Sequence, residues 1–241
     1  PSEPKSTIKS RLFIRQLKDA AGKRLDPDYY QIGYFNLAEA IKKSHYKCVP
    51  LRDLTTLISN GNTPAASDYS EVSTDYPIIK VASYFGEFIS LEKAAYTNSK
   101  KRAAAKKDDI FVLSAAHQAS YVGRFIKYLD TSPKVNTSYV GELICIRSNP
   151  AECNPMYLFS LLNSEFYKVL LNREKTGQTS HIYPKDIRSI LAPQPPIEKQ
   201  REIADHITAI RKQAKQLQAE AKAGLEKAKA EIEAIILGEV A

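Results

Sequence analysis

Basic side chains crowd one short stretch near the middle of the chain. Five of its eight positions are basic: Lys100, Lys101, Arg102, Lys106 and Lys107. Ammonium and guanidinium groups neutralise phosphates and release counterions, which gives affinity for a polyanion without selecting a base sequence. A solvated surface loop has the same composition. The stretch is therefore a candidate for phosphate contacts, with a solvated loop as the alternative.

A second stretch is rich in short hydrogen-bonding side chains around a glycine, and it contains no apolar residue before Ile182. Its candidate contact residues are Lys175, Thr176, Gly177, Gln178, Thr179, Ser180, His181 and Tyr183. A Gln amide pairs with adenine through two hydrogen bonds, and Ser or Thr hydroxyls meet several base edges. A polar surface turn explains the same composition. These residues are thus candidates for base contacts, with the turn as the alternative.

A third stretch lies between these two and follows a strand-like run at residues 110–113. It offers His, Gln and Tyr side chains to bases, and an arginine follows. Its candidates are Ser114, His117, Gln118, Ser120, Tyr121 and Arg124. Phosphate contacts position a protein on nucleic acid, and base contacts select the sequence. The three stretches together are typical of a nucleic-acid-binding protein.

Motifs for covalent chemistry are missing from the sequence. No Gly-rich phosphate loop ends in Gly-Lys-Ser/Thr, and neither Gly-x-Gly-x-x-Gly nor Gly-x-Ser-x-Gly occurs. The four histidines lie far apart and lack the spacing of metal ligands. We therefore expect no catalysis and no metal or cofactor in this chain.

One tetrapeptide comes close to a catalytic motif. Asn154-Pro155-Met156-Tyr157 is similar to the Asn-Pro-Pro-Tyr motif with which amino-methyltransferases hold a base amine. The second proline is missing, and no Gly-rich cofactor loop precedes it. A helix start, with Asn as the cap and Pro at the first position, explains the same residues. The helix start is the preferred interpretation.

The net charge of +8 is unevenly divided along the 241 residues. From Glu198 onward the chain has eight basic and eight acidic residues, so the 27 basic and 19 acidic residues before it carry the whole excess. No aromatic residue lies beyond Tyr183. The sequence thus predicts a basic, aromatic-containing globule, which suits a polyanionic partner, and a neutral tail.

Composition also indicates the compartment. The three cysteines, Cys48, Cys145 and Cys153, are an odd number without a close pair, which argues against a disulfide scaffold or a zinc module. No apolar run approaches the roughly 18 residues of a membrane span. The polar, basic start does not have the pattern of a secretory signal. We expect a cytoplasmic protein without membrane contact.

The tail is predicted to be one long helix that pairs with another. Helix-forming residues dominate from 197 to 237, a length of about 60 Å at 1.5 Å per residue. Apolar residues recur in steps of three and four: Ile203, Ile207, Ile210, Ala214, Leu217, Ala221, Leu225, Ala228, Ile232 and Ile235. This seam is typical of a coiled coil, with one extra step of four after Ala221. The alternative is a helix that lies on its own domain.

The globule is predicted to be α+β, a mixed α/β domain with a twisted sheet of short strands. Helices are expected at residues 36–44, 51–58 and 155–171. Strands are expected at residues 78–81, 110–113, 121–128 and 139–146, the last of them buried on both faces.

The order of these pieces resembles the specificity subunit of type I restriction–modification enzymes. Residues 24–30 look like its opening segment. Residues 49–54 and 60–64 are similar to its Leu-Gly-Asp-Ile helix and Gly-x-Thr-Pro turn, although Arg52 stands where glycine is common. Residues 107–114 resemble its Gly-Asp-Ile-Leu strand, with Lys107 in the place of the glycine.

The later pieces carry the more specific resemblance. Residues 176–179 and 187–192 resemble the family's glycine loop and last strand. Residues 193–203 match its Pro-Pro-x-x-Glu-Gln-x-x-Ile start of the long spacer helix. Residues 115–118 replace a glycine-rich loop, at a place where such domains are expected to vary with their target.

The resemblance implies half of a specificity subunit. Residues 1–47 would be an N-terminal helical segment, residues 48–196 one target-recognition domain and residues 197–241 one spacer helix. The domain would read one half of a split site in double-stranded DNA. The helix would pair antiparallel with a second copy or with another specificity half, and would set the distance between the half-sites.

The resemblance also implies the partners. An adenine methyltransferase subunit, which brings S-adenosylmethionine, would dock on the helices, and a restriction/translocase subunit would join the assembly. Two alternatives stay open: the C-terminal recognition part of a fused methyltransferase–specificity enzyme, and a protein-only coiled-coil adaptor. The target sequence and the spacer length do not follow from these residues.

Overall fold

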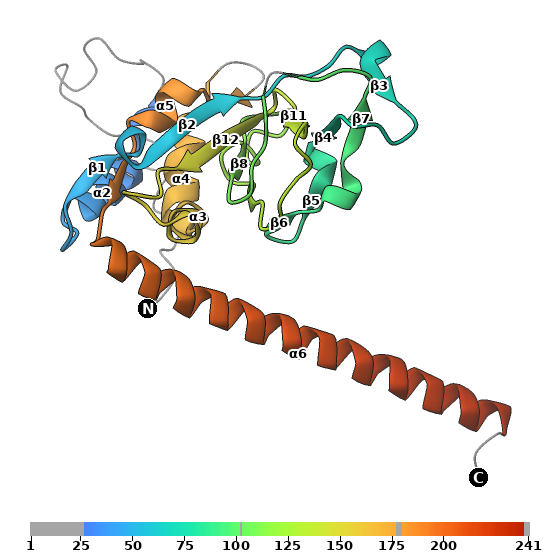
Figure 1. Cartoon of the computed structure of the whole chain (residues 1–241). Coiled ribbons are helices and arrows are strands. Elements are labelled where there is room, and N and C mark those ends of the chain that lie inside the picture. Colours follow the sequence, from blue (N-terminus) through green and yellow to red (C-terminus); the bar gives the residue numbers. More distant parts are fainter. Residues whose placement is uncertain (1–26, 102, 177–179, 239–241) are drawn as a thin grey trace. The chain divides into compact units, whose positions relative to one another are not determined.

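The computed structural model describes residues 27–101, 103–176 and 180–238 (Figure 1). The chain divides into two compact units, residues 1–200 and residues 201–241. The first is a mixed α/β unit with several small sheets, and the second belongs to one long helix. The predicted fold class, a mixed α/β domain followed by a long C-terminal helix, is confirmed.

A six-stranded sheet forms the centre of the first unit. Its order is β2 (Thr55–Asn60), β12 (Leu143–Ser148), β8 (Ile110–Leu113), β10 (Ile126–Tyr128), β6 (Phe88–Ile89) and β5 (Tyr84–Phe85). Neighbouring strands are antiparallel except for the parallel pair β10–β6.

The two middle strands, β8 and β12, are buried on both faces, as expected for residues 143–146. Phe111 and Cys145 face a core cluster shared with the second sheet, and Tyr139 packs edge-on against the Phe111 ring. On the other face the Phe159 ring of a helix stacks on Tyr128, with ring centroids 5.2 Å apart. Such strands consist of consecutive apolar residues, because both faces leave water.

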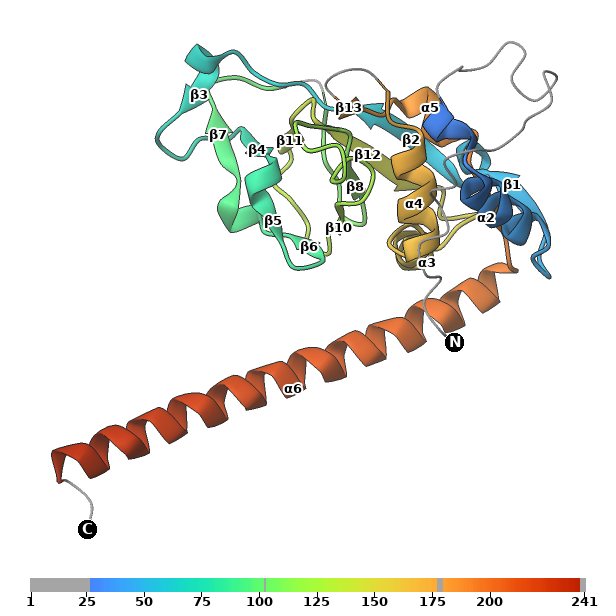
Figure 2. The same cartoon turned by 180° about the vertical axis from the view of Figure 1, so that it is seen from behind.

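A second, four-stranded sheet lies at one end of this unit (Figure 2). Its order is β11 (Ser138–Tyr139), β4 (Pro77–Ile79), β7 (Ala95–Thr97) and β3 (Tyr69–Ser70). Short 3₁₀ turns lie where the chain passes between the two sheets: η3 (Ala66–Asp68) before β3, η4 (Val81–Ser83) after β4 and η5 (Leu91–Lys93) before β7.

The helices gather at the opposite end, beside the pair of β1 (Cys48–Pro50) and β14 (Leu191–Pro193) (Figure 2). They are η1 (Pro27–Tyr30), α2 (Ile32–Lys42), η2 (Leu51–Leu54), α3 (Pro155–Leu162), α4 (Glu165–Arg173) and α5 (Pro184–Arg188). Asn154 caps α3 as predicted: its Oδ1 accepts from the backbone N–H groups of Met156 and Tyr157, each at 3.0 Å. The methyltransferase-like tetrapeptide is thus a helix start.

Several expected elements have other bounds. Residues 51–58 were expected to be helical, but a single 3₁₀ turn ends at Leu54 and β2 follows, because Thr55 and Ile58 belong to a run that pairs with β12. The first helix begins at Ile32 rather than at Asn36. The helix expected at 155–171 is two helices, since Ser164 caps the second one. The strand expected at 139–146 is interrupted between β11 and β12.

The strand expected at residues 121–128 is a strand only from Ile126. Gly123 has φ +73°, a left-handed conformation that ends extended structure and favours glycine. A Cβ atom there would lie 2.8 Å from the backbone carbon of Leu171. This turn therefore requires glycine on both conformational and steric grounds.

The glycine position of the Gly-Asp-Ile-Leu pattern is occupied by Asp108, not by Lys107 as expected. Asp108 has φ 70°, which glycine adopts freely and which Asp tolerates better than most residues. Its Oδ1 accepts a hydrogen bond of 2.6 Å from the Tyr128 hydroxyl. Asp109 and Ile110 then match the Asp-Ile of the pattern.

A buried ion pair joins the start of β8 to β12. The Asp109 carboxylate has no exposed surface and accepts from Nε and Nη2 of Arg147 at 2.7 and 2.8 Å. It also accepts from the backbone N–H of Lys106 at 2.7 Å, while Arg147 donates to the carbonyl of Ala104 at 3.0 Å. The pair thereby fixes the loop that precedes β8 as well as the two strands.

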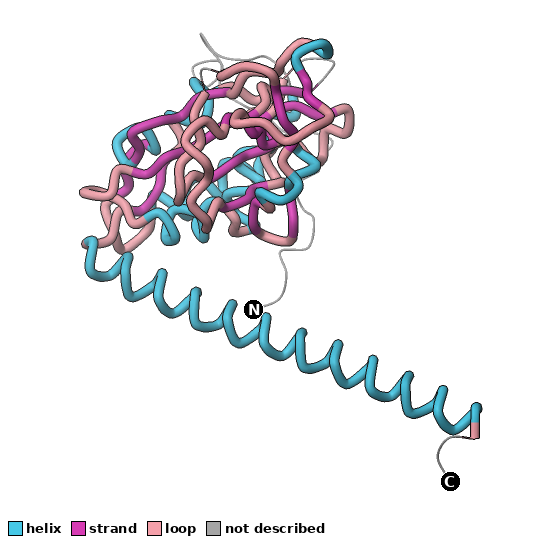
Figure 3. The backbone as a smooth tube through the Cα atoms, turned by 45° about the vertical axis from the view of Figure 1, so that its right-hand side comes forward, coloured by secondary structure: helices cyan, strands magenta, loops and turns pink. Residues whose placement is uncertain are grey.

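The long helix α6 (Ile197–Leu237) has 41 residues and the predicted bounds (Figure 3). Its first turn is anchored by the Gln200 side chain, which is 1% exposed. Gln200 Oε1 accepts from the backbone N–H of Asn154, and Nε2 donates to the carbonyls of Glu152 and Pro195. Among the described residues no helix has both the length and the apolarity of a membrane span.

Replacing Arg147 should cost stability, because it leaves the buried Asp109 carboxylate without its cation. We expect Arg147→Met to lower the free energy of unfolding by about 3–5 kcal/mol in chemical denaturation. Arg52→Met is the control, since Arg52 and Asp53 form an exposed pair at 3.5 Å whose loss should cost under about 1 kcal/mol. Equal losses from the two variants would contradict a structural role for the buried pair.

Candidate nucleic-acid interface

Four segments meet at Ser114, directly after the buried strand β8. The Ser114 N–H and hydroxyl both donate to the carbonyl of Glu142, at 2.8 and 2.9 Å. Its carbonyl accepts from the N–H of Ile182 at 2.9 Å, and its hydroxyl accepts from Nδ2 of Asn60 at 3.2 Å. Ser114 is 2% exposed, so this predicted contact residue is the centre of the framework rather than part of its outer surface.

The two stretches predicted to contact bases are joined by a short strand pair. β9 (Ala115–Ala116) runs antiparallel to β13 (Ser180–His181), with Ser180 opposite Ala116 and His181 opposite Ala115. The backbones of Thr176 and His181 also exchange two hydrogen bonds of 2.7 and 2.9 Å. Stretches more than 60 residues apart in sequence thus form one surface. Gly177, Gln178 and Thr179 lie outside the described residues.

The loop after β9 presents four exposed candidate side chains: His117, Gln118, Ser120 and Tyr121. Its backbone is held from α4, where Nδ2 of Asn172 donates to the carbonyls of Ala119 and Val122 at 2.9 and 2.7 Å. The close approach of Gly123 to α4 fixes the end of the loop. The side chains that could meet bases therefore project from a held backbone, which lowers the entropy lost on binding.

Aromatic and basic groups continue this surface beyond β13. The His181 and Tyr183 rings are stacked with an interplanar angle of 15°, and Lys185 Nζ lies 5.8 Å from the centroid of the exposed Tyr183 ring. Lys175 instead turns toward α4, where its Nζ donates to Oδ1 of Asn172 at 3.2 Å. Arg124 is held by an ion pair of 2.8 Å with Glu165.

The basic stretch lies elsewhere on the unit and is not uniform. Lys101 is only 10% exposed in its side chain and pairs with Asp68 at 2.7 Å. Lys100, Lys106 and Lys107 are exposed, while Arg102 lies outside the described residues. Lys106 and Lys107 precede β8, and Ser114 follows it, so the structure places them at opposite ends of one strand. A four-residue strand separates its ends by roughly 13 Å.

The turn after β2 belongs to the framework around Ser114, although the sequence pattern did not indicate it as a contact segment. Gly61 N–H donates to Leu143 O at 3.1 Å, and Asn62 N–H donates to Tyr139 O at 2.9 Å. A Cβ atom on Gly61 would lie 2.1 Å from the carbonyl oxygen of Tyr139. The turn therefore fits against β11 only with glycine. The similarity of residues 60–64 to a Gly-x-Thr-Pro turn is the sequence feature that could have indicated this segment.

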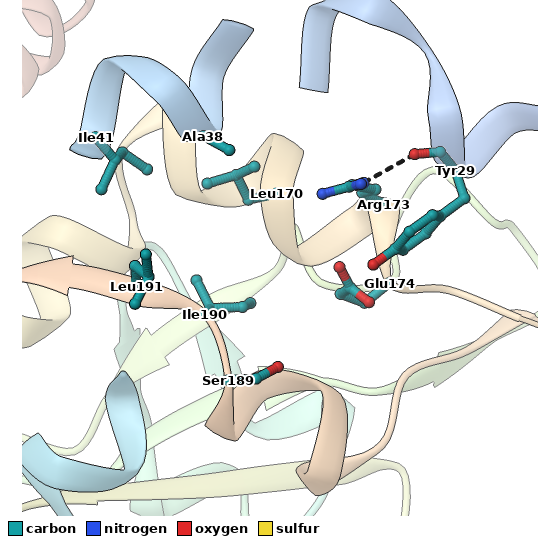
Figure 4. Close-up of a pocket in the computed structure, with 9 residues that line it drawn as sticks. All are labelled: Tyr29, Ala38, Ile41, Leu170, Arg173, Glu174, Ser189, Ile190 and Leu191. Atoms are coloured by element: carbon teal, nitrogen blue, oxygen red, sulfur yellow. Dashed lines mark hydrogen bonds between the residues drawn. The ribbon is translucent and has the colours of Figure 1, made fainter. Parts of the chain in front are cut away.

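A cavity of about 180 Å³ lies apart from these segments, between η1, α2, α4 and β14 (Figure 4). Its lining residues are Tyr29, Ala38, Ile41, Leu170, Arg173, Glu174, Ser189, Ile190 and Leu191. Arg173 is held beside it by a hydrogen bond of 2.9 Å to Tyr29 O and by its guanidinium lying over the Tyr29 ring. None of the predicted contact residues that the structure describes lines this cavity.

Two of the three cysteines, Cys145 and Cys153, are buried. Burial raises the pKa of the Cys153 thiol to about 12 and that of Cys145 well above its ordinary value, so both thiols stay protonated at neutral pH. Within the described part of the chain, no three or more His, Cys, Asp or Glu side chains group as metal ligands would.

Comparisons with known proteins agree with this geometry. The family model of the type I restriction modification DNA specificity domain matches residues 43–227. No curated protein matches the sequence.

Three solved structures share the fold. The HsdS subunit of Thermoanaerobacter tengcongensis has a TM-score of 0.55 and 18% identity, over 77% of this chain and 43% of its own. A structure on complex assembly and conformational transition of the type I R-M system has a TM-score of 0.58 and 20% identity, over 83% and 49%. The S subunit of M. genitalium has a TM-score of 0.50 and 13% identity, over 74% and 42%.

This chain spans less than half the length of each of these structures. The family model, however, covers more than half of the chain and extends from β1 into the long helix. With its buried central strands, its joined polar loops and its long C-terminal helix, this chain belongs to the type I restriction–modification DNA specificity domain family.

Proposed function

We propose that this chain reads one half of a split DNA site for a type I restriction–modification system. The observation that carries the proposal is the joining of residues 114–121 and 180–183 on one surface by the β9–β13 pair. Residues 117, 118, 120 and 121 are exposed there on a held backbone. Such donors and acceptors select bases, while exposed lysines elsewhere supply contacts to phosphates.

The long helix supports the second part of the proposal, which is pairing with a counterpart. Its larger seam residues are half-buried at Ile203 and Ile207 and highly exposed further on: Ile210, Leu217, Leu225, Ile232 and Ile235 are 52–65% exposed. A regular apolar seam on a helix of about 60 Å is typical of a coiled coil. The partner is a second copy of this chain or another specificity half, and the paired helices set the spacing between half-sites.

In this proposal the chain performs no covalent step itself. An adenine methyltransferase subunit binds S-adenosylmethionine and transfers the methyl group, and a restriction/translocase subunit joins the same assembly. The work of this chain is to place those subunits at a chosen sequence in the cytoplasm. The polar loops and the exposed seam support this division, since one suits DNA and the other suits protein.

Mapping of methylated adenines after co-expression with candidate methyltransferase subunits tests the proposal as a whole. We expect a single motif with two specified parts separated by unspecified bases, because the paired helices would hold two reading units apart. Methylation without a motif, or no duplex binding at low salt with and without the methyltransferase, would contradict it. A protein-only adaptor would give the second outcome.

The exposed lysines before β8 are expected to contact phosphates. Lys106→Ala combined with Lys107→Ala should weaken binding to all duplexes and lower the slope of log K against log salt concentration by up to about two units. Lys42→Ala with Lys43→Ala at the C-terminal end of α2 removes the same charge from another surface and serves as the control. An unchanged slope in the first variant would place these lysines away from DNA.

A charged residue in the middle of the seam is expected to weaken pairing of the helices. Leu217→Glu would bury an unpaired carboxylate in the helix pair, so association should weaken by at least roughly 100-fold in analytical ultracentrifugation. Gln218→Glu adds the same charge one residue away from the seam and should leave the oligomeric mass unchanged. If Leu217→Glu keeps its mass as well, the seam is wrongly assigned.

A further inference from the structure

Glu142 places a carboxylate beside the segments that meet at Ser114. Its backbone carbonyl accepts both hydrogen bonds from Ser114, and its half-buried side chain lies next to the turn after β2. One carboxylate oxygen, Oε2, accepts from the Thr63 hydroxyl at 2.7 Å. Glu142 is thus part of the same framework as the loops that were predicted to contact bases.

The orientation of this carboxylate is set by Thr63. The Thr63 hydroxyl accepts from the backbone N–H of Gly141 at 2.8 Å, so its single proton is directed toward Glu142. Gly141 in turn accepts from Nδ2 of Asn60 through its carbonyl, at 2.9 Å. The Thr63 hydroxyl occupies Oε2, and no described residue donates to Oε1. One acceptor oxygen is therefore held in place and open to a ligand.

The Glu142 charge is not neutralised by a neighbouring side chain. In the described part of the chain, no Lys, Arg or His lies within ion-pair distance of its carboxylate. On a surface that approaches phosphates, such a charge opposes binding to every duplex. A specific donor that reaches Oε1 would offset this repulsion only at the correct sequence, which turns an unfavourable charge into a means of discrimination.

Asn62 precedes Thr63 in the same turn and supplies a second polar side chain. It is exposed, and only its backbone makes a hydrogen bond among the described contacts, to Tyr139. The side-chain amide offers one acceptor and two donors. Because Gly61 fixes the turn against β11, this amide and the Glu142 carboxylate are presented by a rigid backbone.

We propose that Glu142, oriented by Thr63 and flanked by Asn62, selects a base in the half-site through its exocyclic amine. A Glu carboxylate in the major groove accepts from N4 of cytosine, and an Asn amide beside it reads the neighbouring base pair. This inference rests on the proposed function and adds a third reading segment to the two expected from the sequence.

Glu142→Gln is the decisive variant. Glutamine keeps an acceptor oxygen for the Thr63 hydroxyl, removes the charge and replaces the open acceptor by an amide donor. With the methyltransferase subunit bound, affinity for a duplex that carries the mapped motif should fall about 10- to 100-fold. Affinity for an unrelated duplex should rise, and the methylation motif should relax at one base pair. A purely structural role would lower both affinities together.

Glu152→Gln is the matched control. Glu152 lies beyond the other end of β12, and its carboxylate likewise accepts one hydrogen bond, from Nε2 of Gln194 at 2.9 Å. Glu152→Gln removes the same charge. The affinities for the motif duplex and for the unrelated duplex should therefore both stay within about twofold of the wild type, and the motif should not change. Thr63→Ser should keep the wild-type motif, whereas Thr63→Val should relax it at the same base pair as Glu142→Gln.

The outcomes separate this inference from the proposed function. If the wild type selects a motif, and Glu142→Gln keeps both that motif and its affinity, the inference is overturned while the function stands. If the wild type selects no sequence, the proposed function fails first. Should Glu142→Gln not fold, Thr63→Val decides, because an unchanged motif in that variant would overturn the inference.

Discussion

The structure depends on two strands that are buried on both faces, β8 and β12. Strands without a solvent-facing side must complete their polar contacts internally at both ends. At one end the Asp109–Arg147 ion pair does this and fixes the loop that carries the exposed lysines. At the other end the Ser114–Glu142 hydrogen bonds do it and collect the polar loops. The contacts that complete the ends of these two buried strands therefore also position the loops of the candidate interface.

Local signals in the sequence were sufficient where one segment determines its own structure. The helix from Ile197 to Leu237 follows from composition and period, and the start of α3 follows from an Asn-Pro pair whose cap is seen in the hydrogen bonds. The buried run of β12 follows from consecutive apolar residues. In the two helices the decisive contacts lie within a few residues of one another, whereas β12 owes its buried run to its own composition.

Local sequence patterns gave the wrong structure where contacts with a distant segment determine it. Leu51, Leu54 and Ile58 lie at helical spacing, yet pairing with β12, about 90 residues later, makes residues 55–58 a strand. Gly123 ends extended structure because Leu171 lies against it. The β9–β13 pair and the Thr63–Glu142 bond join residues more than 60 positions apart, so the candidate contact residues were identified by type while their grouping was not. The pairing of Lys101 with Asp68 could not be predicted either, because the two residues lie far apart in the sequence.

The loop after β9 is held largely through its backbone. Asn172 donates to the carbonyls of Ala119 and Val122, which every amino acid possesses, and Gly123 supplies a conformational requirement at the end of the turn. Residues 117, 118 and 120 can therefore exchange with little effect on the loop's shape, whereas the Tyr121 ring packs edge-on against Phe125, with centroids 4.7 Å apart. Evolution can change such a surface one residue at a time while the scaffold remains constant, and a new target preference does not require a new fold.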